Sequence, residues 1–153
     1  MPTKKMSNVD VIQELRSKTG VSVMAVKRAL EKAGGDIKKA EEFLKEEAGA
    51  MALKKSDRET KAGIIQSYVH GGRIGVLVKL KCETDFVAKN EDFQNFSREI
   101  AMQIAASEAS NVEELLKEPY VRNSSMTVSD YLKEAISKFG ENIEISTFNR
   151  IEL

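Results

Sequence analysis

The chain has 153 residues, 41% hydrophobic and 31% charged, which supports one ordinary folded domain or two small ones. Lysine plus arginine number 24, as do aspartate plus glutamate, so no overall positive field points to nucleic acid. The single cysteine, Cys82, excludes an intramolecular disulfide and a zinc site built on several cysteines. With no long apolar run and a polar start, we expect a cytoplasmic chain without a membrane or nucleic-acid partner.

The charges are unevenly distributed along the chain. Residues 1–55 carry 12 basic and 8 acidic side chains, whereas residues 56–153 carry 12 basic and 16 acidic ones. The two parts are therefore expected to face different surfaces.

Residues 1–49 have the pattern of three short helices. A capping box at Ser7 to Asp10 starts the first helix, which Thr19-Gly20 ends. Ser22 caps the second, and Asp36 caps the third, which we expect to close at Gly49. The residues expected to face inward are Val9, Ile12 and Leu15, then Val23, Val26, Leu30 and Ala33, then Ile37, Ala40, Phe43 and Leu44.

The second of these helices has more apolar residues than one face can hold. Met24, Ala25 and Ala29 lie off its inward stripe. They either wrap a tight bundle or form an apolar patch for a partner, since methionine adapts to foreign surfaces.

Residues 50–62 contain no proline or glycine and are rich in helix-favouring and charged residues. We interpret them as a helical linker, a semi-rigid spacer between two binding surfaces.

Residues 63–153 predict a small sheet with packed helices. Two β-rich runs, 64–70 and 73–82, flank Gly71-Gly72, the composition of a hairpin turn. Helices are predicted around residues 93–104, at 111–117 and after a capping box at 127–130, and an alternating strand from Ile143 to the end. The fold class is therefore α+β, with a small antiparallel sheet whose open edges invite self-association.

The chemistry-bearing residues do not form a recognisable catalytic motif. Glu83 and Asp85 lack a companion base, and Cys82 is expected to be a small buried hydrophobe. A hydrolase using His70, Cys82 and Asp85 would need the cysteine and histidine within hydrogen-bond reach, whereas a hairpin places them at opposite ends. We expect that the chain is not an enzyme and that it binds no metal ion and no cofactor.

Thr84-Asp85-Phe86-Val87 places an acid beside a large aromatic residue where a strand meets a helix. In one interpretation Thr84 is an N-cap and Phe86 a core anchor. In the other the segment is a protruding wedge that enters a pocket of a partner.

Several motifs together resemble the translation elongation factor Ts family. They are Leu15 to Gly20, Lys27 to Leu30, Gly35-Asp36, Ser67 to Val78, Thr84 to Asn90, Ile100 to Ser107 and Gly140 to Ile143. Their order and spacing match the family over nearly the whole chain, and Thr-Asp-Phe-Val-Ala-Lys is the most specific of them.

The resemblance implies a guanine nucleotide exchange factor that binds elongation factor Tu, both with GDP and free of nucleotide. Asp85-Phe86, within the segment Thr84 to Val87, would insert near the switch region and disturb the Mg²⁺ site of Tu, so that GDP leaves and GTP loads. The three-helix module resembles ubiquitin-associated domains and would dock through Arg16, Met24 and Lys27. Further partner contacts are expected at the hairpin end, from His70, Gly71 and Arg73.

The chain departs from the family in two places. The family often has Thr-Gly-Ala-Gly-Met-Met-Asp-Cys-Lys where this chain has residues 19–27. Only one core half is present, and short members pair two chains, so the resemblance implies a homodimer. The alternative function is an adaptor that binds a protein without accelerating nucleotide release.

Overall fold

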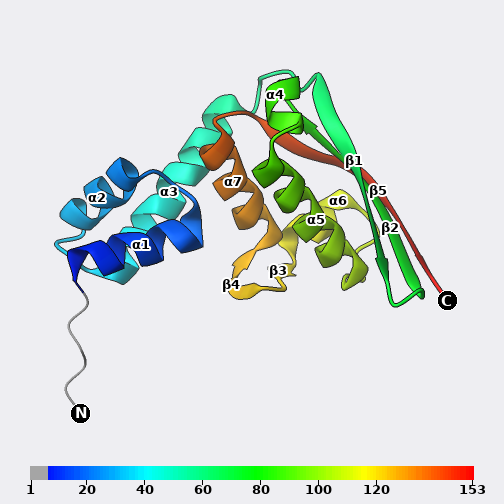
Figure 1. Ribbon diagram of the computed structural model, residues 1–153, viewed down its shortest axis with the longest axis horizontal. Coiled ribbons are helices and arrows are strands. Elements are labelled where there is room, and N and C mark those ends of the chain that lie inside the picture. Colours follow the sequence, from blue (N-terminus) through cyan, green and yellow to red (C-terminus); the bar gives the residue numbers. More distant parts are fainter. Residues whose placement is uncertain (1–6) are drawn as a thin grey trace, which may run out of the picture.

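The structure is a computed structural model that describes residues 7–153; the predicted polar start of the chain, residues 1–6, lies outside the described residues. A three-stranded sheet with helices on one face makes up the larger part, and the N-terminal helices extend from it beyond α7 (Figure 1). This confirms the predicted α+β class. The elements are α1 (Asn8–Thr19), α2 (Val23–Lys32), α3 (Ile37–Lys55), β1 (Ala62–His70), β2 (Ile74–Cys82), α4 (Asp85–Ala88), α5 (Glu91–Ala105), α6 (Val112–Lys117), β3 (Pro119–Tyr120), β4 (Asn123–Thr127), α7 (Val128–Phe139) and β5 (Ile143–Glu152).

The first three helices have the predicted caps. The side chains of Ser7, Ser22 and Asp36 each accept a hydrogen bond from a backbone N–H in the first turn of the helix that follows. A separate small core joins the three helices, formed by the buried side chains of Leu15, Val26, Ala29, Ala40 and Leu44.

Two details of the predicted inward stripes are wrong. Val9 and Val23 are exposed, whereas Ala29, placed off the stripe, is buried. Ala29 lies three residues after Val26, on the same face of the helix, so the buried face of α2 is centred on these two residues.

The third helix does not close at Gly49, as we expected, but continues to Lys55. A glycine inside a helix costs only about 1 kcal/mol relative to alanine. Here alanines flank it, and Ala48 is buried while Ala52 packs against the main core. Packing of the second half of α3 against the core therefore outweighs the cost at Gly49.

The sheet has the antiparallel order β1-β2-β5. The inner face of β2 is apolar as predicted, with Val76, Val78, Leu80 and Cys82 buried. In the hairpin turn, Arg73 N donates to His70 O at 3.0 Å, and both glycines between them have positive φ.

Strand β5 does not alternate simply, as we expected it to. Leu80 pairs with Ile145 but the adjacent Lys79 pairs with Thr147, so Ser146 is an extra residue in a bulge. The bulge reverses the alternation: Ile143 and Ile145 face the core before it, and Phe148 packs inward after it.

Helices α5 and α7 supply most of the main core. Phe93, Phe96, Ile100 and Ile104 of α5 are buried, as predicted, and α7 begins at the predicted capping box. The short hairpin formed by β3 and β4 was not predicted. With only two residues in β3, it is too short to show a period in the sequence.

Candidate functional site

The segment Thr84 to Val87 follows the end of β2 at Cys82 and forms the N-cap and the start of a one-turn helix, α4. Thr84 Oγ1 accepts a hydrogen bond from Val87 N at 3.3 Å, which makes Thr84 the N-cap of α4. Phe86 is 90% exposed, so the interpretation as a core anchor is wrong. Val87 and Ala88 pack into the main core, while Asp85 and Phe86 face the solvent. We refer to Asp85 and Phe86 as the wedge.

A carboxylate from the turn between α7 and β5 binds the base of the wedge. Glu141 Oε1 accepts hydrogen bonds from the backbone N–H groups of Glu83 and Thr84, both at 3.1 Å. Its second oxygen, Oε2, accepts the Thr84 hydroxyl at 2.7 Å. The acceptor is 57 residues away from Thr84 in the chain. The wedge is thus attached to a distant part of the core.

A second group of bonds joins the same region to the segment after α3. Glu83 Oε2 accepts from Asn142 N at 3.3 Å and lies 3.7 Å from the Arg58 guanidinium. The buried Asn142 side chain donates to Arg58 O at 2.9 Å. Lys55 Nζ donates to Gly140 O at 2.7 Å. Glu83 and the α7–β5 turn are therefore bonded to Arg58 and to Lys55, at and just after the end of α3. The first half of α3 belongs to the N-terminal module, residues 7–49.

The predicted docking residues of that module are all exposed. Arg16, Met24 and Lys27 lie near the turn between α1 and α2, and the Arg16 guanidinium donates to Val21 O at 3.4 Å. Of the extra apolar residues of α2, Ala29 is buried and Ala25 is half-buried in the bundle, whereas Met24 is 62% exposed. A patch for a partner stays a prediction.

The hairpin end carries the other predicted contact residues. His70, Gly71 and Arg73 are exposed, and Tyr68 Oη lies 2.9 Å from His70 Nδ1. This end lies far from the wedge, because β2 runs from Ile74 to Cys82, about 26 Å at 3.3 Å per residue. Figure 1 shows α4 near one end of the sheet and the hairpin turn at the other.

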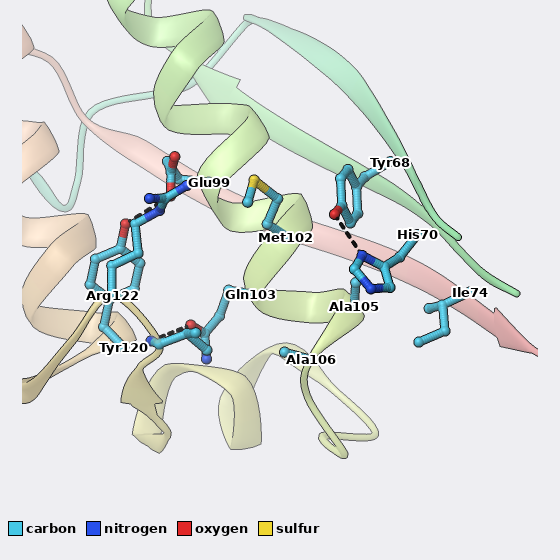
Figure 2. A pocket seen from close by; sticks show the side chains of 11 residues that line it. Tyr68, His70, Ile74, Glu99, Met102, Gln103, Ala105, Ala106, Tyr120 and Arg122 are labelled. Atoms are coloured by element: carbon cyan, nitrogen blue, oxygen red, sulfur yellow. Dashed lines mark hydrogen bonds and ion pairs between the residues drawn. The ribbon is translucent and has the colours of Figure 1, made fainter. Parts of the chain in front are cut away.

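A cavity of about 430 Å³ that the sequence did not indicate lies beside the hairpin end. Tyr68, His70 and Ile74 form one side of it, Met102 and the last turn of α5 form its floor, and the β3–β4 turn forms the other side (Figure 2).

The polar groups around this cavity already have partners. Glu99 accepts from the Arg122 guanidinium and from Tyr120 Oη, the latter at 3.2 Å. Gln103 accepts from Val121 N at 2.8 Å, which fixes the β3–β4 turn. The cavity is thus best suited to an apolar side chain.

The residues of the hydrolase hypothesis do not come together. Cys82 pairs with Ala62 in the hairpin, whereas His70 pairs with Ile74 at the other end. Burial, assisted by the nearby Glu141 carboxylate, raises the pKa of the Cys82 thiol to about 11, which keeps it protonated at neutral pH. A cysteine–histidine pair is therefore not formed within the chain.

Within residues 7–153, no three acidic, histidine or cysteine side chains cluster in a way that would hold a metal ion. None of the helices over this range has the length and apolarity needed to cross a membrane.

The predicted site residues thus form three separate surfaces: the wedge, the α1–α2 turn and the hairpin end. Glu141 and Asn142 have no predicted role, although both belong to the motif Gly140 to Ile143. Gly140 gives a local signal for the end of a helix, and it is the left-handed C-cap of α7. No local pattern could show that the next residue reaches Thr84.

Comparison with known proteins gives the family. The family model described as Elongation factor TS matches residues 83–153. The chain is 39% identical to elongation factor Ts of Carboxydothermus hydrogenoformans over 194 residues, covering 97% of this chain and 89% of that relative. It is 36% identical to elongation factor Ts of Desulfosudis oleivorans, covering 95% of this chain and 97% of the relative.

A third relative is about twice as long. Elongation factor Ts of Clostridium kluyveri is 45% identical over 147 residues, which cover 95% of this chain but 48% of the relative. The first alignment spans more residues than this chain has, so that relative carries residues without a counterpart here. The chain belongs to the elongation factor Ts family.

Proposed function

We propose that this chain is a guanine nucleotide exchange factor for elongation factor Tu. It binds Tu carrying GDP, promotes the release of GDP and so allows GTP to load during translation elongation. The observation that carries the proposal is Phe86, a large aromatic side chain held 90% exposed on a helix whose base is bonded to a distant turn. An exposed aromatic anchor is typical of residues that dominate a protein interface.

In the proposed mechanism, the wedge inserts near the switch region of Tu and displaces the elements that support its Mg²⁺ ion. Nucleotide phosphates and Mg²⁺ hold each other through ligand positions that tolerate little displacement, so both bind more weakly. The effect is reciprocal, because a factor that lowers nucleotide affinity must lose affinity for Tu when nucleotide binds. The chain itself needs no cofactor and forms no covalent intermediate. We therefore propose a binding protein of the cytoplasm rather than an enzyme.

The N-terminal module is proposed to dock on Tu through Arg16, Met24 and Lys27. An exposed methionine and two exposed cations near the same turn offer apolar contact together with charge. Because α3 continues into the core as one helix, docking by the module would set the direction from which the wedge approaches.

We also propose that the chain pairs as a homodimer through the outer face of the sheet. The half of this face nearest the hairpin is the more apolar, with exposed Val69, Leu77 and Ile151 beside Ser67 and Asn149. In the other half Ile65 lies opposite Lys79, next to Lys81 and Glu144. A second copy would cover the apolar half. Sedimentation velocity tests this: the native chain is expected to be a dimer and Leu77→Arg a monomer, and a native monomer would contradict the pairing.

The experiment that tests exchange is stopped-flow release of a fluorescent GDP analogue from Tu. We expect the native chain to accelerate release and Phe86→Ala to remove most of the gain, at least about tenfold, as truncation of a buried interface anchor does. Asp85→Ala is expected to have a smaller effect in the same direction. Val9→Ala is the matched control, since Val9 is also an exposed apolar residue, 64% exposed, outside the proposed contacts.

The second candidate is an adaptor, favoured by the exposed Met24 on the α1–α2 turn, which would let the module bind a protein on its own. The same experiment separates the two functions. If the native chain binds Tu but leaves the release rate unchanged, exchange is wrong and the adaptor takes its place.

A further inference from the structure

We propose that Glu141 is the positioning residue of the wedge: its carboxylate holds the N-terminal end of α4 so that Phe86 stays projected toward the partner. This inference rests on the exchange function proposed above, because that function gives the wedge its task. It adds a residue that lies 55 positions beyond Phe86 in the chain and is expected to act without contacting nucleotide.

Helix α4 requires support from outside because it has only four residues, Asp85–Ala88. A single helical turn is unstable in water, since ordering its backbone costs more than its few hydrogen bonds return. Phe86 is 90% exposed and gains almost no packing of its own. Its direction is therefore set by the two ends of the turn. Ala88 is buried in the core at one end, and Thr84 lies at the other.

The carboxylate of Glu141 fixes the Thr84 end in three ways. One oxygen accepts two successive backbone N–H groups, those of Glu83 and Thr84, at 3.1 Å each. The other oxygen accepts the Thr84 hydroxyl proton at 2.7 Å. A hydroxyl has one proton and two lone pairs. Donation to Glu141 therefore leaves the lone pairs of Thr84 Oγ1 for Val87 N, so the carboxylate orients the N-cap itself.

Glu141 is in turn held on both sides, which makes it a firm support. Gly140 before it ends α7 in the left-handed conformation, and its carbonyl oxygen accepts from Lys55 Nζ at 2.7 Å. Asn142 after it is buried and bonds to the backbone of Arg58 and to Glu83. The backbone of the α7–β5 turn is thus held by bonds other than those of the Glu141 carboxylate.

The test is the dependence of GDP-analogue release on exchange-factor concentration, which separates the release rate at saturation from the concentration at half-saturation. We expect Glu141→Ala to lower the saturating rate by about tenfold, the effect of losing charge-assisted hydrogen bonds, and to change the half-saturating concentration less than about twofold. Glu141→Gln keeps one oxygen for the two N–H groups and is expected to recover most of the rate. A role in folding alone would not produce this separation.

Glu144→Ala is the matched control. Glu144 also accepts a threonine hydroxyl from a distant segment, Thr60 Oγ1 at 3.1 Å, but it makes no contact with the wedge. We expect its saturating rate to equal that of the native chain. If Glu141→Ala does not fold, Glu141→Asp carries the test, since its carboxylate is one methylene short of the wedge and the same fall in saturating rate is expected.

A double variant decides whether Glu141 acts through Phe86. If it does, Glu141→Ala together with Phe86→Ala releases nucleotide no more slowly than Phe86→Ala alone. Two results would overturn the proposal and leave exchange by the wedge intact. One is a saturating release rate that is lower in the double variant than in Phe86→Ala. The other is a folded Glu141 variant whose saturating rate equals that of the native chain. If Phe86→Ala itself had no effect, the proposed exchange mechanism would fail, and the role of Glu141 with it.

Discussion

The two ends of the sheet are built differently. At the wedge end, Glu141 and Asn142 bond to segments more than fifty residues away in the chain. At the hairpin end, His70 bonds to its neighbours, through its carbonyl oxygen to Arg73 N and through its ring to Tyr68, and Arg73 O also accepts from the backbone N–H of Leu153 at 3.0 Å. A protruding one-turn helix needs side-chain support from distant segments, whereas the turn at Gly71-Gly72 is closed by its own backbone bond from Arg73 to His70.

The two ends also differ in their connection to the N-terminal module. At the wedge end, the last residue of α3, Lys55, donates to Gly140 O, and the Asn142 side chain donates to Arg58 O just after that helix. Helix α3 also packs against α7, where Lys45 Nζ lies 3.2 Å from an Asp130 carboxylate oxygen. The residues that surround the hairpin end come from α5 and the β3–β4 turn instead. A disturbance of the module is thus expected to reach the wedge first.

The largest effect is expected from Gly63→Ala, which breaks the sheet at the wedge end. Gly63 pairs with Lys81, and a Cβ atom there would lie 2.2 Å from the carbonyl oxygen of Leu80. Backbone atoms must move to relieve this contact, so we expect the free energy of unfolding to fall by about 3 kcal/mol or more. Urea denaturation followed by circular dichroism measures it.

Gly75→Ala is the matched control on the same sheet, nearer the hairpin. Its Cβ would meet only Ile151 Cγ1, at the ordinary contact distance of 3.9 Å. We expect the free energy of unfolding to change by no more than about 1 kcal/mol. The lower flexibility of the unfolded chain stabilises the variant and offsets a small packing cost in the strand. Equal stabilities of the two variants would show that the wedge end is no more closely packed than the hairpin end.

Local patterns in the sequence predicted most of the framework. Caps at Ser7, Ser22 and Asp36, the buried faces of β2 and α5, and the turn at Gly71-Gly72 each depend on residues within one helix turn or one hairpin. Such features follow from backbone geometry and apolar periodicity, which a single sequence displays.

Features that depend on distant contacts were missed or wrong. The bulge at Ser146 is fixed by pairing with β2, and the passage of α3 through Gly49 is fixed by packing against the core. The bond from Glu141 to Thr84 joins positions 57 residues apart, and the cavity beside His70 needs three separate elements. The exposure of Phe86 agrees with one of two interpretations that the sequence left open. An aromatic residue after an N-cap is compatible with either a core or a surface position.

A smaller effect is expected from pH, through Glu134 at the interface between α3 and α7. Burial, with a contribution from the Asp130 carboxylate, raises the pKa of Glu134 to about 7, while Lys45 opposes the rise. Further charged groups line the surfaces that Glu134 borders, among them Lys133 on α7, Glu42 and Glu46 on α3, Lys18 on α1, and Glu99 on α5. Glu134 is therefore protonated in weak acid and loses its proton near neutral pH, where it becomes a partly buried negative charge beside another.

The direction of the pH effect follows from the raised pKa. A carboxyl that binds its proton more tightly in the folded state stabilises the fold fully below its ordinary pKa of 4.5, and this contribution is lost as the pH rises through about 7. Glu134→Gln cannot ionise and keeps the neutral form at every pH. We expect the variant to match the native chain at pH 4, below that ordinary pKa, and to exceed its stability by about 2 kcal/mol at pH 8, after allowance for partial exposure.

Amide hydrogen exchange locates this effect. The two proteins are compared at the same pH, so that the intrinsic exchange rates cancel. At pH 8 we expect the amides of α3, of α7 and at the base of the wedge to exchange more slowly in Glu134→Gln than in the native chain. The amides of the hairpin end are expected to exchange alike in both, because that end contacts neither α3 nor Glu134. An equal change at both ends would mean that the sheet transmits the disturbance as one body, and the distinction between its two ends would not hold.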